Sequence, residues 1–183
     1  MSRKLLSLVV LLAAMILAAP SSASAAISRA QACPGAYTAP NASTVVRARA
    51  ATICLMNYER TIRRLPALRF NSALALAGAR HAGNMAARRY FSHVAPGGVS
   101  FVTRILRSGY TRPGTSWSMG ENIAWGQGTL STPASTVGAW MRSPGHRANV
   151  LKTTFREVGV GAVLGSPIGG AGAIYAAEYG RRG

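Results

Sequence analysis

Residues 139–151 read AWMRSPGHRANVL, and this stretch decides how the surrounding chain is read. Before it, Pro133 stands at the first position of a predicted helix that places Trp140 on an apolar face. A Pro-Gly pair at 144–145 interrupts that helix. His146 follows the interruption directly, at an element end of the kind where a rigid scaffold usually presents functional groups.

Three further helices are expected upstream of this stretch. Apolar positions recur at helical spacing from Ser43 to about Arg64, where Leu65 to Leu68 break the pattern. Asn71 or Ser72 can cap a second helix that runs to about Tyr90, and Ser100 can cap a short third helix ending near Gly109. A loop to Met119 is predicted after it.

The end of the chain is expected to be extended. Residues 157–164 (EVGVGAVL) and 173–179 (AIYAAEY) are typical of strands, and a glycine-rich turn at 167–172 joins them into a hairpin. The glycines of the first strand do not form a phosphate-binding loop, because no helix follows them.

The first residues indicate export. Arg3 and Lys4 precede the apolar run Leu5 to Ala19, which is shorter than the ~20 residues that span a bilayer. Ala23-Ser24-Ala25 offers a cleavage site. We therefore expect a signal peptide at 1–25, a leader segment at 26–42, one domain at 43–183, no transmembrane segment and a secreted, extracellular product.

Two cysteines, Cys33 and Cys54, are present. In an exported protein they are expected to form a disulfide, which would contribute roughly 3 kcal/mol on the chain-entropy model. A second pair that could complete a zinc knuckle is missing from the sequence, which favours a structural role over a chemical one.

Charge and composition exclude several classes of function. The chain has 21 Lys plus Arg against four Glu and no Asp, a formal charge of +17 that falls to +15 without Arg3 and Lys4. Four carboxylates leave little room for a calcium cage or an Asp-based triad. The basic residues form no run and no aromatic ladder, so we expect no specific nucleic-acid binding but allow peripheral contact with anionic surfaces.

The candidates for chemistry are few. His93 follows a predicted helix end, Glu121 lies in GENIA (120–124), and Glu157 opens a predicted strand. With His146 they form the candidate group. Glu59 is expected to pair with Arg63 on one helix, and His81 is expected to be structural. Glu178 is expected to pair with Arg181 or Arg182.

Five segments in this order resemble the secreted CAP superfamily, also called SCP-like or pathogenesis-related-1-like proteins, and in particular its bacterial branch. They are LMNYER with LPAL (55–60, 65–68), HAGNMA to FSH (81–86, 91–93), GENIA (120–124), AWM to HRANVL (139–141, 146–151) and EVGVG (157–161). The resemblance covers most of the chain after the leader.

The resemblance implies an α/β/α sandwich with a central, largely antiparallel sheet and one open groove. In the family two His and two Glu meet on the groove floor, which by position are His93, Glu121 and His146 together with one more acidic residue. The second Glu of animal and plant members is missing after Trp140, where Ser143 stands nearby; Glu157 is the expected substitute. Asn122, Ser143 and Asn149 are expected as groove neighbours.

Such a cluster suits zinc or another divalent metal, with His93 and His146 as ligands. The alternative is a hydrogen-bonded scaffold without metal. The resemblance favours a binding module for a metal, a lipid or a cell-envelope ligand, and Tyr110 to Met119 is a candidate lipid-binding loop. Alternatives are a metal-assisted hydrolase with Glu121 or Glu157 as general base, and a cationic surface-active or antimicrobial factor.

Overall fold

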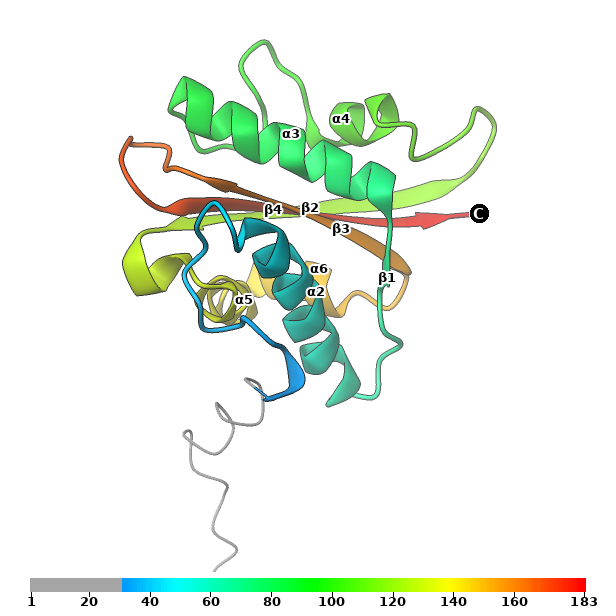
Figure 1. The fold of residues 1–183 in the computed structure, drawn as a ribbon. Helices are drawn as coiled ribbons and strands as arrows, with labels where there is room; N and C mark the ends of the chain where they lie inside the picture. The colour runs from blue at the N-terminus through cyan, green and yellow to red at the C-terminus, as the bar shows by residue number, and fades with distance from the viewer. Residues whose placement is uncertain (1–30) are drawn as a thin grey trace, which may run out of the picture.

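The computed structural model describes residues 31–183. Its centre is a four-stranded sheet in the order β1-β3-β4-β2. Figure 1 shows helices α3 and α4 on one face of this sheet and helices α2, α5 and α6 on the other. The predicted α/β/α sandwich is therefore confirmed. The predicted signal peptide and the first part of the predicted leader lie outside the described residues.

The helices agree closely with the capping signals in the sequence. Asn71 accepts hydrogen bonds from two backbone N–H groups at the start of α3, and Ser100 and Thr132 cap α4 and α5 in the same way. The helices are α2 (Val45–Thr61), α3 (Ser72–Arg88), α4 (Phe101–Arg107), α5 (Pro133–Arg142) and α6 (Pro144–Leu151), with a 3₁₀ turn η1 (Gly128–Ser131).

The predicted C-terminal hairpin is present, as β3 (Glu157–Leu164) and β4 (Ala173–Arg182). A long strand β2 (Trp117–Gly126) pairs antiparallel with β4, and the short β1 (Arg69–Phe70) pairs parallel with β3. β2 was not expected from the sequence, which predicted a loop as far as Met119. Its buried residues include Glu121 and Asn122, and helices cover both faces of the sheet, so the strand lacks the alternation that marks a half-exposed strand.

Glycines bring α3 directly against β3. A Cβ atom at Gly159 would overlap the backbone nitrogen of Ala75, and one at Gly161 would overlap that of Ala79. No side chain fits in that space. The pattern EVGVG therefore marks a close helix–strand contact.

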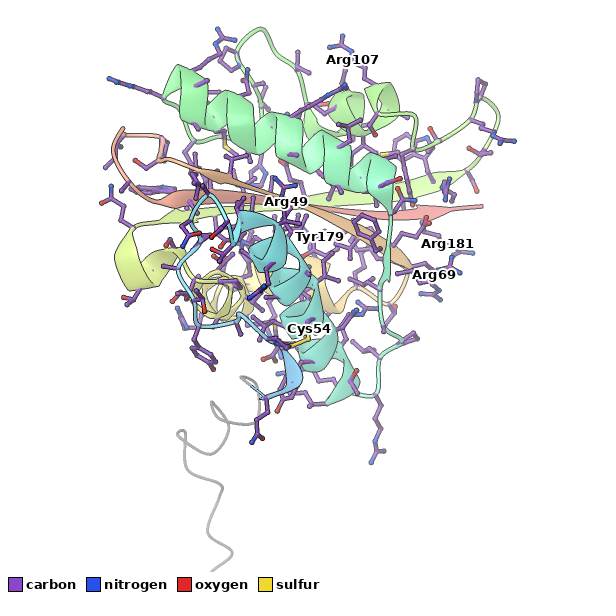
Figure 2. The ribbon with its side chains drawn as sticks, viewed as in Figure 1. Arg49, Cys54, Arg69, Arg107, Tyr179 and Arg181 are labelled. Atoms are coloured by element: carbon purple, nitrogen blue, oxygen red, sulfur yellow. A yellow bond between two sulfur atoms is a disulfide. The ribbon has the colours of Figure 1, made fainter. Side chains whose placement is uncertain are left out.

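The largest part of the core lies between the sheet and α2, α5 and α6. Trp140, Phe155, Tyr175 and Tyr179 are fully buried there. Figure 2 shows Tyr179 between the sheet and α2, and its hydroxyl donates to the Met56 sulfur. This core fixes α5 and α6, and thereby the helix that carries His146.

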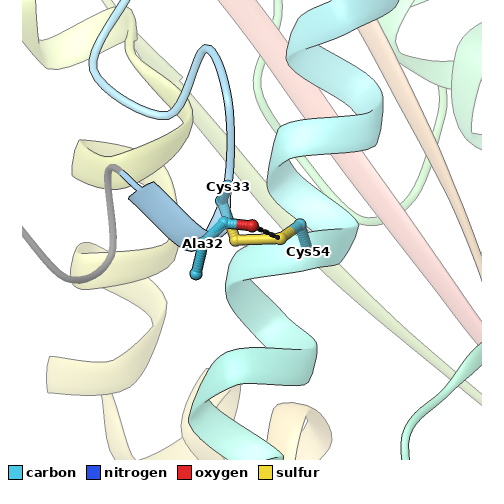
Figure 3. Close-up of a disulfide and its surroundings, with 3 residues drawn as sticks. All are labelled: Ala32, Cys33 and Cys54. Atoms are coloured by element: carbon cyan, nitrogen blue, oxygen red, sulfur yellow. Dashed lines mark hydrogen bonds between the residues drawn. A yellow bond between two sulfur atoms is a disulfide. The ribbon is translucent and has the colours of Figure 1, made fainter.

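The Cys33–Cys54 disulfide is confirmed, with Cα atoms 5.6 Å apart (Figure 3). It ties the leader to α2, and the backbone N–H of Ala134 also donates to the carbonyl of Ala36. Within residues 31–183, none of the helices has the length and apolar character that crossing a membrane requires.

Candidate functional site

Glu121 is the centre of the candidate site. Its Oε1 accepts a hydrogen bond of 2.7 Å from Nδ1 of His93, and its Oε2 lies 2.5 Å from Nη2 of Arg104. His81 Nε2 lies 3.7 Å from the same Oε2. Both carboxylate oxygens of Glu121 are therefore engaged by basic side chains, and the carboxylate itself is buried.

The fold brings these residues together at an open edge of the sheet. β2 is the last strand in the sheet order, and it carries Glu121. His93 comes from the loop after α3, whereas His146 lies on α6 in the opposite helix layer. Their ring centroids are only 6.3 Å apart. The two histidines predicted from the sequence thus meet over the edge strand.

Two asparagines hold α6 in place beside β2. Asn122 donates from Nδ2 to the carbonyl oxygen of His146, over 2.9 Å. Asn149 donates from Nδ2 to the carbonyl oxygen of Glu121 and to Oδ1 of Asn122. These residues were predicted as neighbours of the site, and they position its backbone. Ser143 lies at the junction of α5 and α6, where its carbonyl accepts from the Arg147 N–H.

The hydrogen bonds determine the proton positions on two histidines. Nε2 of His81 lies 3.0 Å from the carbonyl oxygen of Ser92, which can only accept, so Nε2 carries the proton. Nδ1 of His93 donates to the Glu121 carboxylate, so in neutral His93 the Nε2 lone pair is available to a ligand.

Burial affects the pKa of both His81 and His146. It lowers the pKa of His81, although the nearby Glu121 charge opposes this effect. It also lowers the pKa of His146, and His93 lowers it further. His81 and His146 are therefore held toward the neutral form, in which an imidazole nitrogen can accept a hydrogen bond or bind a metal.

The second carboxyl group beside Glu121 is Glu178. It stands directly opposite Glu121 on β4 and is fully buried, and among residues 31–183 neither of its oxygens has a hydrogen-bond donor as a partner. Burial and then the Glu121 charge raise the pKa of Glu178 well above its usual value. The raised pKa favours the protonated form of Glu178, whose hydroxyl can donate to the Glu121 carboxylate. The prediction that it pairs with Arg181 or Arg182 is wrong.

This hydrogen bond also shapes the titration of Glu121. Burial alone would raise the pKa of Glu121, but hydrogen bonds from His93 and Glu178 and the charge of Arg104 outweigh it. The pKa of Glu121 consequently lies below its usual value, and the group is ionised at neutral pH.

Glu157 lies apart from this group, contrary to the sequence-based expectation. It accepts hydrogen bonds from Tyr110 Oη over 2.7 Å, Arg182 Nη2 over 3.0 Å and Asn71 Nδ2 over 3.1 Å. The reason is topological: β4 lies between β3 and β2, so two strand spacings, about 10 Å, separate β3 from the edge strand. Glu157 instead links the start of α3 to the end of β4.

The donor set at the site is two imidazoles supported by one carboxylate. His93 and His146 suit zinc or a similar ion as ligands, and Glu121 behind His93 is the usual orienting partner. Within residues 31–183, however, no group of three or more His, Cys, Asp or Glu side chains is arranged to hold a metal ion. His93 and His146 are therefore the two residues of this group that could act as metal ligands.

An α/β/α sandwich with a His–Glu–His constellation at the edge of its sheet defines the class of this protein. A family model places it within that class: residues 54–176 match the CAP family, described as the cysteine-rich secretory protein family. The chain belongs to this family.

A bacterial protein is similar in sequence to part of the chain. The chain is 35% identical over 109 residues to the uncharacterized protein YkwD of Bacillus subtilis (strain 168), covering 60% of this chain and 40% of that protein. It thus spans less than half the length of this relative.

Solved structures share the fold. An extracellular protein of Bacillus anthracis containing an SCP domain superposes with a TM-score of 0.62 at 24% identity, over 76% of this chain and 43% of that one. An outer surface protein of Borrelia burgdorferi gives a TM-score of 0.59 at 18% identity, over 72% of this chain and 90% of its own.

Proposed function

We propose that this chain is a secreted bacterial CAP protein that acts as a binding module, with His93 and His146 as the ligand-facing pair. The engagement of both Glu121 oxygens carries the proposal. A carboxylate held by His93 and Arg104 orients an imidazole and is poorly placed to take a proton from a substrate. Export is supported by the N-terminal sequence and by the extracellular B. anthracis neighbour.

A divalent metal is the first ligand we propose for this pair. Two imidazoles without a third protein ligand favour weak binding with several positions left to water. Calorimetric titration of zinc into the metal-stripped protein is expected to give one site. His93→Ala and His146→Ala should each abolish it, and Arg147→Ala, beside His146, should not. Zinc binding that survives in both histidine variants would refute the assignment.

A metal-assisted hydrolase is the alternative function for the same site. Neither carboxylate proposed as its general base is suitably placed. Glu121 is bound by His93 and Arg104, and Glu157 is bound by Tyr110 away from the histidines. His93 backed by Glu121 is the remaining candidate base. We expect no turnover of ester or peptide substrates that depends on His93. Turnover that His93→Ala abolishes while the fold is retained would establish the hydrolase instead.

A lipid or other apolar ligand would need a different place. A cavity of about 440 Å³ lies beside α5, lined by Leu55, Trp125, Leu130 and Val137 together with Tyr37 of the leader. We propose this cavity for an apolar ligand in preference to residues 110–119. A cavity of this size and lining is typical of small-ligand sites.

Trp125 offers a direct test of the apolar ligand. Titration with a fatty acid should change tryptophan fluorescence saturably in the wild type, and Leu130→Asp should weaken that change. Binding in the cavity should persist in moderate salt, whereas adhesion driven by the positive charge of the chain would disappear. Loss of the signal with salt would favour the cationic surface-active alternative.

A further inference from the structure

A second candidate site lies at the other end of the edge strand. Three segments converge there: the start of β2, the residues after α6, and the end of β4. Together they enclose a cavity of about 390 Å³, lined by Ser116, Trp117, Ser118, Lys152, Thr154 and Arg181, with Gly183 at its rim. Four residues of strand separate Trp117 from Glu121, which is about 13 Å.

The side chains that line the cavity carry positive charge and no negative charge, and the one carboxylate among its described lining residues is the terminal group of Gly183. Lys152 and Arg181 are both exposed, and no Glu lines the cavity. Within residues 31–183 the Arg181 guanidinium has no hydrogen-bond or ion-pair partner, whereas its neighbour Arg182 is bound to Glu157. Lys152 is positioned by Phe155, whose ring centroid lies 4.8 Å from Nζ. These two cations are therefore available to an anionic group.

Trp117 adds a flat apolar surface to this charge. Its side chain is 46% exposed, although the comparable Trp140 is fully buried. No acceptor for the indole N–H is found in the described part of the chain. The hydroxyl groups of Ser116, Ser118 and Thr154 line the same cavity, and each can both donate and accept. An aromatic face, several hydroxyls and two cations suit a ring that has an apolar face, hydroxyl groups and a negative charge.

We propose that this cavity binds an anionic saccharide, a sugar unit that carries a carboxylate or phosphate group. The sugar ring lies on Trp117, and Lys152 and Arg181 hold the anionic group. The site is distinct from the His93–His146 pair, but it lies on the same strand, so one polymer could occupy both.

Calorimetric titration with a short oligogalacturonate tests the proposal. Trp117→Ala and the double substitution Lys152→Ala with Arg181→Ala should each weaken binding by about tenfold or more. The matched control is Arg88→Ala with Arg107→Ala, which removes the same charge from α3 and α4. Figure 2 shows Arg107 on α4, on a different side of the molecule from Arg181. This control should change affinity less than twofold.

Three other ligands complete the experiment. A neutral dextran oligomer and inorganic phosphate should each bind much more weakly than the oligogalacturonate. Dextran has no anionic group for Lys152 and Arg181, and phosphate has no sugar ring for Trp117. Oligodeoxythymidine should also bind more weakly. Equal weakening by the control pair, equal binding of phosphate alone, or tighter binding of the oligonucleotide would each overturn the proposal.

Discussion

Glu121 and Glu178 face one another across β2 and β4, and both side chains are buried. Two ionised carboxylates buried in this position would repel each other, and burial and the Glu121 charge raise the pKa of Glu178 well above its usual value, which favours a proton on Glu178. The site is thus built on a neutral acid that nothing in the spacing of the sequence indicates.

Replacing Glu178 by glutamine tests whether Glu178 is protonated in the folded protein. Glu178→Gln keeps a donor for Glu121 and removes the titration, so the variant should fold and should gain stability relative to the wild type as pH rises. The folded-state pKa of Glu178 is raised, so its contribution to stability is complete below the unfolded-state value of about 4.5 and is lost as pH rises toward the folded value.

Urea unfolding of both proteins at pH 5 and pH 8 measures this difference. Glu121 does not affect the comparison. Because its pKa is lowered, its contribution to the free energy of unfolding changes only below about pH 4.5. A difference in stability that is the same at both pH values would contradict the assignment of the proton.

Arg104 should be among the most costly residues to replace. It pairs with the buried Glu121 and also donates to the carbonyls of His93 and Val99. Arg104→Met leaves Glu121 without its cation and should lower the free energy of unfolding by about 3–5 kcal/mol. Arg107→Met, on the exposed side of the same helix, should change it by less than about 0.5 kcal/mol. Chemical denaturation of both variants gives the comparison.

The disulfide should account for a measurable part of the stability. Replacing Cys33 and Cys54 together by Ala should lower the free energy of unfolding by about 2–4 kcal/mol, because the bond closes a loop with a sequence separation of 21. Thermal unfolding with and without a reductant checks this. The wild type should lose stability on reduction, and the double variant should show no response.

Two glycines of α3 should respond in opposite directions to alanine. A Cβ at Gly78 would lie 2.6 Å from the Ala176 carbonyl oxygen, so Gly78→Ala should destabilise the fold by about 1–3 kcal/mol. Gly83 has open space around that position, so Gly83→Ala should stabilise the helix by about 0.5–1 kcal/mol. Equal effects in thermal unfolding would show that α3 does not contact the sheet as described.

The sequence was most informative where local chemistry determines structure. Asn71 and Ser100 indicated two helix starts, because a cap acts on its own first turn, and Pro133 indicated a third. The ion pair of Glu59 with Arg63 was also predictable, being one helical turn long. The strand β2 was not predictable, because helices cover both faces of the sheet and the strand lacks a regular alternation of buried and exposed residues.

The residues of the candidate site were likewise only partly predictable from the sequence. His93, Glu121 and His146 could be named from family resemblance, and their proximity depends on pairing that spacing alone does not reveal. Glu157 was chosen for the second carboxylate because it opens a strand, but its strand is separated from β2 by β4. Glu178 holds that place because its register puts it opposite Glu121. Arg104 carried no sequence signal.

The backbone contact at Gly159 and Gly161 also governs which parts of the site can move. Because no side chain separates them, α3 and β3 pack directly against each other, and His81 lies on this closely packed helix. His93 lies beyond the end of α3, with its side chain 48% exposed and its carbonyl held by Arg104. Movement of His93 toward His146 would therefore displace a loop next to a fixed surface, and it would strain the hydrogen bond from Arg104 to the His93 carbonyl.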